Sequence, residues 1–281
     1  ERSFVAFLLC EGQCHAGGGR FQTMSTLNVT IVQSPLAWHD AEANRATFSQ
    51  IIGNLTESTD IIVLPEMFTT GFSMDAPDLA ESADGVSVKW MQQMAKDSAA
   101  AVCGSLIIVD HGEYFNRFFF IQADGVVATY DKRHLFRLAD EQRYYSQGGE
   151  RIVFEYKGFR ICPMICYDLR FPIWSRNRDD YDLLIYVANW PSRRQLAWDT
   201  LLRARAIENL AFVAGVNRTG RDGNDLPYKG GSTVIDFKGE PIANLGNEDG
   251  VATVSLNIKE LETFRERFAF QKDADAFELK G

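Results

Sequence analysis

Short apolar runs alternate with longer amphipathic runs along this chain, and no other feature restricts its possible folds as strongly. The apolar runs have the length of strands, and the runs between them have the length and periodicity of helices. The first series comprises expected strands at 27–33, 60–66 and 100–109 and expected helices at 41–55 and 86–100. Such alternation predicts an α/β fold. The second half repeats the scheme, with strands at 182–189 and 211–217 around a helix at 195–210.

Three further segments have the pattern of β-hairpins, which predicts mixed sheets rather than purely parallel ones. The segments 113–132 and 152–166 each hold two apolar runs joined by Asp-Gly or Lys-Gly, and 230–246 is the third. Glycine accepts the positive φ that tight turns require. No proline-rich or serine-rich linker separates the two halves. We therefore predict one domain of two packed sheets with helices outside, at residues 24–270, followed by a tail at 271–281.

The charge balance argues against one large class of partners. Lys and Arg number 29 against 38 Asp and Glu, which gives a formal net charge of −9. Nucleic-acid affinity needs clustered cations, so we expect no nucleic-acid partner. The longest apolar runs, such as 4–10 and 61–65, are far shorter than the roughly 20 residues that cross a bilayer, and we expect no membrane association. The net charge does not exclude small anionic ligands, because a few local arginines outweigh the negative surface charge at short range.

Five cysteines at irregular spacing indicate a reduced protein, and we expect a cytoplasmic location. Residues 1–23 include a short apolar run, but Glu1 stands where a signal peptide carries positive charge. No small-x-small cleavage site follows that run. We therefore interpret Met24 as the natural start and the residues before it as an upstream extension. Cys10 and Cys14 would then have no role.

Two other cysteines, Cys162 and Cys166, lie four residues apart in the stretch ICPMICYDLRFP. In an extended strand, at about 3.3 Å per residue, they are about 13 Å apart, too far for a disulfide. A zinc site needs three or four ligands, and none of the four histidines flanks these cysteines at ligand spacing. Cys162 lies inside the apolar run and is interpreted as a core residue. Cys166 ends the run, where α/β proteins often hold a nucleophile.

Two other apolar runs also end on ionisable side chains. The run DIIVLPE ends on Glu66, where apolar neighbours desolvate the carboxylate and favour its use as a base. The run GVVATYDK ends on Lys132. Strand ends can meet at one rim of a sheet, so Glu66, Lys132 and Cys166 form a candidate site. Taken singly, each is equally explained as an ordinary residue at a strand end.

The order of three motifs, LPEMF, YDKRHLF and CYDLRFP, resembles the carbon-nitrogen hydrolase (nitrilase) family over residues 27–268. The resemblance implies a four-layer α-β-β-α sandwich of two mixed sheets that forms a homodimer through outer helices. It also implies a catalytic triad: Glu66 as general base, Lys132 as the cation that stabilises the tetrahedral intermediate, and Cys166 as nucleophile. No metal or organic cofactor is required. A second glutamate near the triad is a family feature, and Glu141 in FRLADEQRYYSQGG matches it.

Within the family, the stretches CYDLRFPIWSRN and ANWPSRRQLAWDTLLRARAIEN are most similar to the omega-amidase branch, which hydrolyses 2-oxoglutaramate and 2-oxosuccinamate. These amides are anions, and a guanidinium binds a carboxylate through two hydrogen bonds. Arg170, four residues after Cys166, is the candidate ligand, with a salt bridge that orders the loop as the alternative. Trp190, Phe68 and Tyr167 are candidate pocket walls. The backbone N–H of Tyr167 is also a candidate oxyanion donor.

Three other interpretations stay open. The same fold could serve an amidase for N-carbamoyl amines or deaminated glutathione, and a carbamoylase releases carbon dioxide as well as ammonia. A non-catalytic binding module would have no need to keep Glu66, Lys132 and Cys166 together. A Cys–His acyltransferase or protease would use His134, which the family pattern assigns to a structural HLF stretch. That last interpretation predicts that His134→Ala abolishes turnover while Lys132→Ala is mild.

Overall fold

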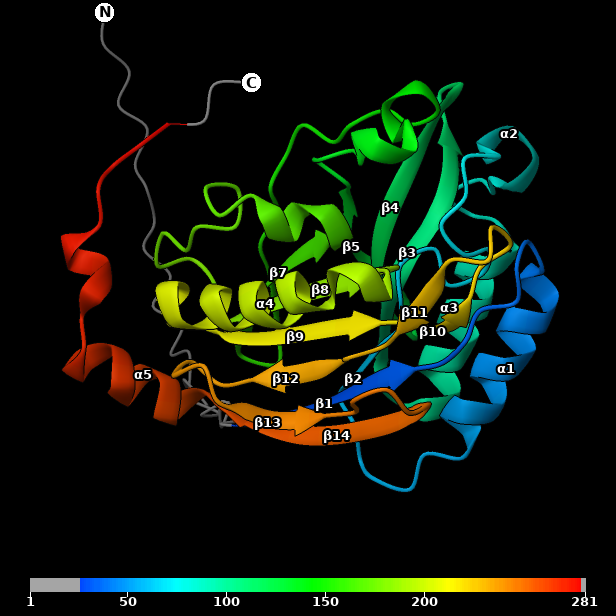
Figure 1. Cartoon of the computed structure of the whole chain (residues 1–281). Coiled ribbons are helices and arrows are strands. Elements are labelled where there is room, and N and C mark those ends of the chain that lie inside the picture. The colour runs from blue at the N-terminus through cyan, green and yellow to red at the C-terminus, as the bar shows by residue number, and fades with distance from the viewer. Residues whose placement is uncertain (1–25, 279–281) are drawn as a thin grey trace, which may run out of the picture.

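The computed structural model describes residues 26–278. Its strands form two six-stranded sheets and one short hairpin (Figure 1). The first sheet has the order β14 (Gly250–Asn257), β1 (Thr26–Gln33), β2 (Ile61–Val63), β3 (Ala101–Asp110), β4 (Glu113–Gln122) and β5 (Gly125–Asp131). The second has the order β13 (Pro241–Asn244), β12 (Thr233–Ile235), β9 (Phe212–Asn217), β8 (Leu183–Ala188), β7 (Phe159–Ile165) and β6 (Phe154–Tyr156). Both sheets are mixed, as predicted, because β1–β2–β3 and β7–β8–β9 pair in parallel and the remaining neighbours antiparallel.

Helices cover the outer faces of the two sheets. The helices α1 (Ala41–Gly53) and α3 (Val86–Ser98) pack on the first sheet, and α4 (Gln195–Asn209) packs on β9 and β12 of the second (Figure 1). The layers therefore run helix, sheet, sheet, helix, and the predicted four-layer sandwich is confirmed. Connecting segments contain the remaining short elements: α2 (Ala76–Leu79), η1 (Arg137–Ala139), η2 (Glu141–Arg143), η3 (Cys166–Arg170), η4 (Ser192–Arg194), β10 (Thr219–Arg221) and β11 (Pro227–Lys229).

Strand β4 shows how the sequence divides its side chains between two cores. Phe118 and Phe120 point between the sheets, where Phe120 contacts Tyr156 of β6. Phe119 and Ile121 belong to the other core, which α1 and α3 cover. Successive residues of a strand point to opposite faces, so a run of four apolar residues serves both cores at once. The first sheet is therefore buried on both sides at this strand.

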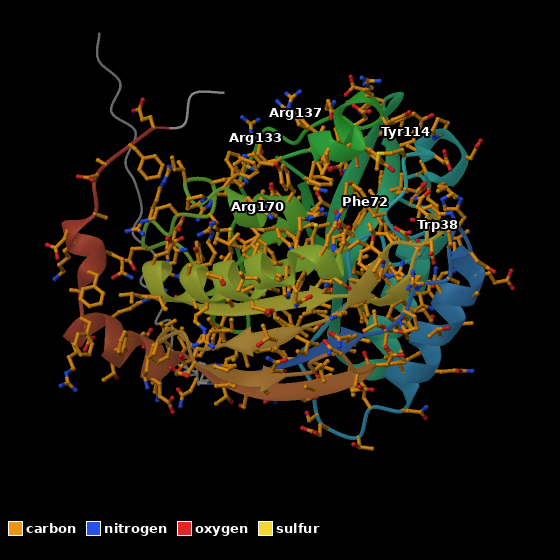
Figure 2. The ribbon with its side chains drawn as sticks, in the orientation of Figure 1. Trp38, Phe72, Tyr114, Arg133, Arg137 and Arg170 are labelled. Atoms are coloured by element: carbon orange, nitrogen blue, oxygen red, sulfur yellow. The ribbon has the colours of Figure 1, made fainter. Side chains whose placement is uncertain are left out.

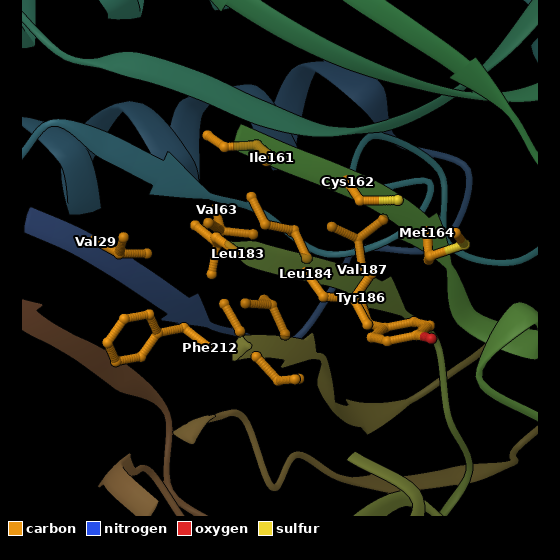
Figure 3. Close-up of a cluster of buried hydrophobic side chains, with 14 of the residues drawn as sticks. Val29, Val63, Ile161, Cys162, Met164, Leu183, Leu184, Tyr186, Val187 and Phe212 are labelled. Carbon is orange, nitrogen blue, oxygen red and sulfur yellow. The ribbon is translucent and has the colours of Figure 1, made fainter. Parts of the chain in front are cut away.

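The parallel strands β8 and β9 of the second sheet are buried along their whole length. Figure 3 shows Cys162 of β7 among buried apolar side chains that include Leu184 and Val187 of β8. Cys162 is fully buried and its thiol is free. Burial raises its pKa to about 12, so the thiol stays neutral and acts as an apolar core residue.

Two elements near the C-terminus lie outside the list of elements predicted from the sequence. Strand β14 is an edge strand with one fully buried apolar side chain, Leu256, so its sequence lacks a clear apolar period. Helix α5 (Ile258–Arg267) follows β14 directly and buries only Leu261. The predicted boundary at residue 24, the extension 1–23 and the interpretation of Cys10 and Cys14 lie outside the described residues. Over the described part of the chain, every helix is too short or too polar to cross a membrane.

Phe48 of α1 provides a test of the outer core. Its side chain is fully buried and meets Phe68 edge to face, with ring centroids 5.6 Å apart. We expect Phe48→Ala to lower the free energy of unfolding by about 3–5 kcal/mol through lost burial and an unfilled cavity. Val86→Ala, at a side chain that is 63% exposed, is the control and should change it by less than about 0.5 kcal/mol. Urea denaturation measures both, and equal small effects would contradict this packing.

Candidate active site

Cys166 begins the 3₁₀ helix η3 at the carboxyl end of β7, in a strained turn. Its φ is 44°, a left-handed value that non-glycine residues rarely adopt and that costs of order 1–3 kcal/mol. Two contacts stabilise the turn. The carboxylate of Asp168 accepts a hydrogen bond from the backbone N–H of Ile165 at 3.0 Å, and the Arg205 guanidinium of α4 donates to the carbonyl oxygen of Leu169. The sulfur is thereby presented at the end of the strand.

Glu66 lies in the loop after β2, fully buried, with every contact to its carboxylate made by a donor. Oε1 accepts from Asn116 Nδ2 at 2.8 Å and from Lys132 Nζ at 2.9 Å. Oε2 accepts from the backbone N–H of Asn189 at 2.8 Å. Asn116 belongs to β4 of the first sheet, whereas Asn189 directly follows β8 of the second, so both sheets orient this carboxylate. Oε2 has the fewer donors and keeps room for a proton.

Lys132 follows β5 directly and lies between two buried carboxylates. Its Nζ donates to Glu66 Oε1 at 2.9 Å and to Glu141 Oε1 and Oε2 at 2.9 and 3.0 Å. Burial alone would lower the pKa of Lys132, but the charges of Glu141 and Glu66 outweigh it and raise the pKa above its usual value. Burial raises the pKa of Glu141, while Lys132 opposes that shift. The ammonium is therefore a permanent positive charge at this site.

The Cys166 thiol is neutral in this environment. Burial, followed by the nearby charge of Glu66, raises its pKa well above the usual value, and the positive charge of Lys132 compensates only in part. Sγ lies 3.9 Å from the carbonyl oxygen of Asn189. A neutral thiol is a weak nucleophile, so attack requires a base that removes its proton. The site holds such a base in Glu66, whose charge acts on the thiol.

A pocket of about 390 Å³ opens over Cys166 and Lys132. Of the predicted wall residues, Tyr167, Arg170 and Trp190 line it. Phe68 does not: it is fully buried beneath the first sheet and packs on Phe48 and Trp90, with ring centroids 5.6 Å away in each case. The interpretation of Phe68 as a pocket wall is therefore wrong, because the chain turns back after Glu66 and directs this ring into the outer core. Phe72 takes that place, its ring centroid 5.0 Å from Lys132 Nζ.

One side of the pocket is strongly positive. Arg170, Arg193 and Arg194 line it, and none of them forms an ion pair within the described part of the chain. Arg170 lies over the ring of Trp190, 5.1 Å from its centroid, so the alternative of a loop-ordering salt bridge has no partner among residues 26–278. Burial and then the charge of Arg193 lower the pKa of Arg194, with a smaller contribution from Arg170. Mutually repelling cations beside a pocket favour an anionic ligand.

His134 does not line the pocket that opens over Cys166. Its Nδ1 lies 2.7 Å from Asp168 Oδ1, and its ring stacks on Phe171 at a centroid distance of 3.8 Å. Its backbone N–H also donates to Asp168. The imidazole therefore supports the turn that carries Cys166, and this geometry disfavours a Cys–His dyad. Within residues 26–278 no group of three or more metal-ligating side chains gathers.

Three polar residues of this site were missed by the sequence analysis. Asn189 ends an apolar strand, so the rule that selected Cys166 and Glu66 applies to it equally. Asn116 interrupts an apolar strand, and a lone amide in such a run is a signal for a buried hydrogen-bonding role. Asp168 is fully buried and accepts from Tyr130 as well as from the turn. Its role depends on folding of η3, which the sequence pattern does not reveal.

Comparisons with known proteins agree on one family. Residues 28–266 match the carbon-nitrogen hydrolase family. The chain is 46% identical over 257 residues to omega-amidase YafV of Escherichia coli strain K12, which covers 91% of this chain and 100% of that protein. It is 33% identical over 243 residues to 2-oxoglutaramate amidase of Bacillus subtilis strain 168, which covers 85% and 93% respectively. XC1258 from Xanthomonas campestris, a solved CN-hydrolase superfamily protein with an arsenic adduct in its active site, is 45% identical with a TM-score of 0.89, covering 92% of this chain and 100% of that one.

The chain therefore belongs to the carbon-nitrogen hydrolase family. It is a hydrolase of carbon–nitrogen bonds, and the fold and the family predicted from its motifs are both confirmed.

His134 offers a test of the site geometry. We expect His134→Ala to reduce amide hydrolysis by less than about tenfold, because its ring contacts Asp168 and not the sulfur. Removal of a general base usually costs about 100-fold or more. Steady-state kinetics of the purified variant, with folding checked by circular dichroism, make the measurement. A loss of that larger size in a folded variant would restore the Cys–His interpretation.

Proposed function

We propose that this protein is an omega-amidase, which hydrolyses the terminal amide of 2-oxoglutaramate or 2-oxosuccinamate to a 2-oxo dicarboxylic acid and ammonia. The observation that carries the proposal is the combination of a thiol beside a buried Glu66–Lys132–Glu141 cluster with arginines in the same pocket that have no ion-pair partner among residues 26–278. The first feature supports attack on an amide, and the second supports an anionic substrate. Relatives named omega-amidase and 2-oxoglutaramate amidase support the same substrate class.

In the proposed first half-reaction, Cys166 attacks the amide carbonyl carbon while Glu66 takes the thiol proton. Oε2 of Glu66 is the assigned acceptor, because Oε1 already accepts from both Asn116 and Lys132. A C–S bond forms and the carbonyl oxygen becomes an oxyanion. Lys132 Nζ and the backbone N–H of Tyr167 stabilise that charge, at a few kcal/mol for each donor. Glu66 then returns the proton to the nitrogen, the C–N bond breaks, and ammonia leaves.

In the second half-reaction, water hydrolyses the thioester. Glu66 removes a proton from the water as its oxygen bonds to the acyl carbon, and the C–S bond breaks as that proton passes to the sulfur. Glu141 holds Lys132 in place through two hydrogen bonds and balances its charge. The original thiol proton leaves with ammonia and a proton from water replaces it on the sulfur, so the cycle regenerates the enzyme with water as the co-reactant and needs no cofactor.

Arg170 is the proposed ligand of the substrate carboxylate, with Arg193 and Arg194 adding positive potential. Trp190 fixes Arg170 by stacking on it, and Tyr167 forms part of the wall. The second candidate is hydrolysis of an N-carbamoyl compound that also bears a carboxylate. The same thiol, base and arginines would serve both substrates, and only the products separate them.

We further propose that the protein is a cytoplasmic homodimer. Residues 24–270 of each subunit would form a single domain. Leu196 and Ile207 on the outer face of α4 are 81% and 48% exposed, which favours a partner on that helix. The resemblance to the family implies the same helix. Sedimentation of the wild type and of Ile207→Asp tests the dimer.

Ammonia release tests the proposed activity. We expect the wild type to release ammonia from 2-oxoglutaramate and 2-oxosuccinamate, and Cys166→Ala to lose that activity by at least about 1,000-fold, because the nucleophile is absent. N-carbamoyl amino acids and glutamine are the control substrates. Consumption of a carbamoyl compound with release of carbon dioxide, and none of the 2-oxo amides, would replace the substrate assignment. Retained activity in Cys166→Ala would overturn the mechanism.

The pH profile provides a second test. The active form holds a protonated thiol and a protonated ammonium, and the pKa values of both Cys166 and Lys132 are raised. Each group therefore stays protonated as the pH rises past its ordinary pKa, about 8.5 for cysteine and about 10.4 for lysine. We expect kcat/KM to stay level between about pH 8 and 10. A decline with a midpoint near about 8.5, in protein that remains folded, would contradict these shifts.

A further inference from the structure

Trp38 lines the pocket from the loop between β1 and α1, and three neighbours fix its indole ring. Its face stacks on His39, with ring centroids 4.3 Å apart and planes 21° from parallel. A Cβ added at Gly71 would lie 3.0 Å from Cε3 of the indole. A Cβ added at Gly223 would overlap the indole, at 2.6 Å from Cε2. The ring therefore packs directly against glycine backbone on two sides.

Gly223 belongs to the 219–229 hairpin, which comprises β10, β11 and their turn, and this hairpin is internally rigid. The carboxylate of Asp222 accepts hydrogen bonds from the backbone N–H groups of Asn224 and Leu226 and from the hydroxyl of Tyr228. Four residues of the hairpin line the pocket: Asp222, Asn224, Leu226 and Tyr228. The hydrogen bonds of Asp222 therefore hold this wall of the pocket in shape.

A buried arginine ties this wall to the segment that carries Trp38. Arg218 is fully buried and donates to the carbonyl oxygen of Leu36 at 3.2 Å and to that of Arg221 at 2.8 Å. Its guanidinium also lies 4.8 Å from the ring centroid of Tyr228. Thr219 adds a backbone hydrogen bond to the carbonyl oxygen of Ser34. The hairpin and the loop of Trp38 are therefore held together independently of the catalytic cluster.

We propose that Trp38, held against Gly223, is the specificity-determining residue that limits the length of the amide substrate. The inference rests on the proposed function, since it concerns the substrate of the same pocket. The pocket, at about 390 Å³, lies near the lower end of the usual range for small-molecule sites. An indole ring that its neighbours hold in place cannot move aside for extra methylene groups, so a longer substrate would clash with it. A pocket without such a ring would accept the longer substrate. A substrate held at Cys166 and at Arg170 can take up extra methylene groups only by bowing toward the other walls, and Trp38 is one of them. Figure 2 shows Phe72 between Trp38 and Arg170.

The test compares a series of substrates of increasing length: 2-oxosuccinamate, 2-oxoglutaramate and 2-oxoadipamate. We expect Trp38→Ala to raise the ratio of kcat/KM for 2-oxoadipamate over 2-oxoglutaramate by about tenfold or more, the size that a methylene group in a tight pocket carries. Trp38→Phe should give a smaller increase. Gly223→Ala should lower kcat/KM for every member, because its methyl group displaces the indole. Gly53→Ala, where an added Cβ meets nothing within 4 Å, is the matched control and should leave the ratio unchanged.

An unchanged ratio of kcat/KM in folded Trp38→Ala protein would overturn the proposal. A gain in kcat/KM confined to N-alkyl amides would also overturn it, because Trp38 would then limit the size of the leaving group. A second measurement does not depend on amide turnover. Succinate, glutarate, adipate and pimelate are compared as protectants of Cys166 against iodoacetamide in both proteins. We expect the longer diacids to protect Trp38→Ala better than the wild type. If the wild type hydrolyses no 2-oxo amide while this difference appears, the proposed function fails and the length limit stands.

Discussion

The buried contact of Lys132 with Glu66 and Glu141 is the interaction on which the rest of the site depends. Removing one member of a buried ion pair typically costs about 3–5 kcal/mol, because the remaining charge has no partner. Here one ammonium serves two carboxylates, so their positions are coupled. Glu66 is thereby held in the interior beside the thiol of Cys166. The amides of Asn116 and Asn189 supply the remaining hydrogen bonds and fix its orientation.

Much of this architecture could be predicted from the order of apolar runs. The strands 27–33 and 182–189 correspond closely to β1 and β8, because the first is rich in β-branched residues and largely buried, and the second is an almost continuous buried apolar run. Strand β14 and helix α5 escaped prediction, since a half-exposed edge strand carries no strong period. The hairpin 219–229 also escaped, because its conformation depends on Asp222 and on a buried arginine and not on an apolar pattern.

The candidate site also contains residues that the sequence predicted and one that it placed wrongly. Glu66, Lys132 and Cys166 stand at the ends of apolar runs. In the structure Lys132 and Cys166 line one pocket, and Glu66 accepts a hydrogen bond from Lys132. Phe68 was assigned wrongly, because only Met67 separates it from Glu66 and the chain reverses direction there, where Met67 has a φ of 42°. A local reversal of this kind depends on tertiary contacts, such as the hydrogen bond from the Met67 N–H to Ser105 Oγ. Proximity in sequence therefore did not imply proximity to the substrate.

The two sheets contribute different halves of the reacting groups. Glu66, Lys132 and Asn116 come from the first sheet, and Cys166 and Asn189 from the second, and the two sheets pack on each other through the inter-sheet core. A small slide of one sheet over the other would separate base from nucleophile while leaving every strand and helix intact. Activity in this protein therefore depends on how the two sheets are placed relative to each other. Heat inactivation should precede loss of secondary structure.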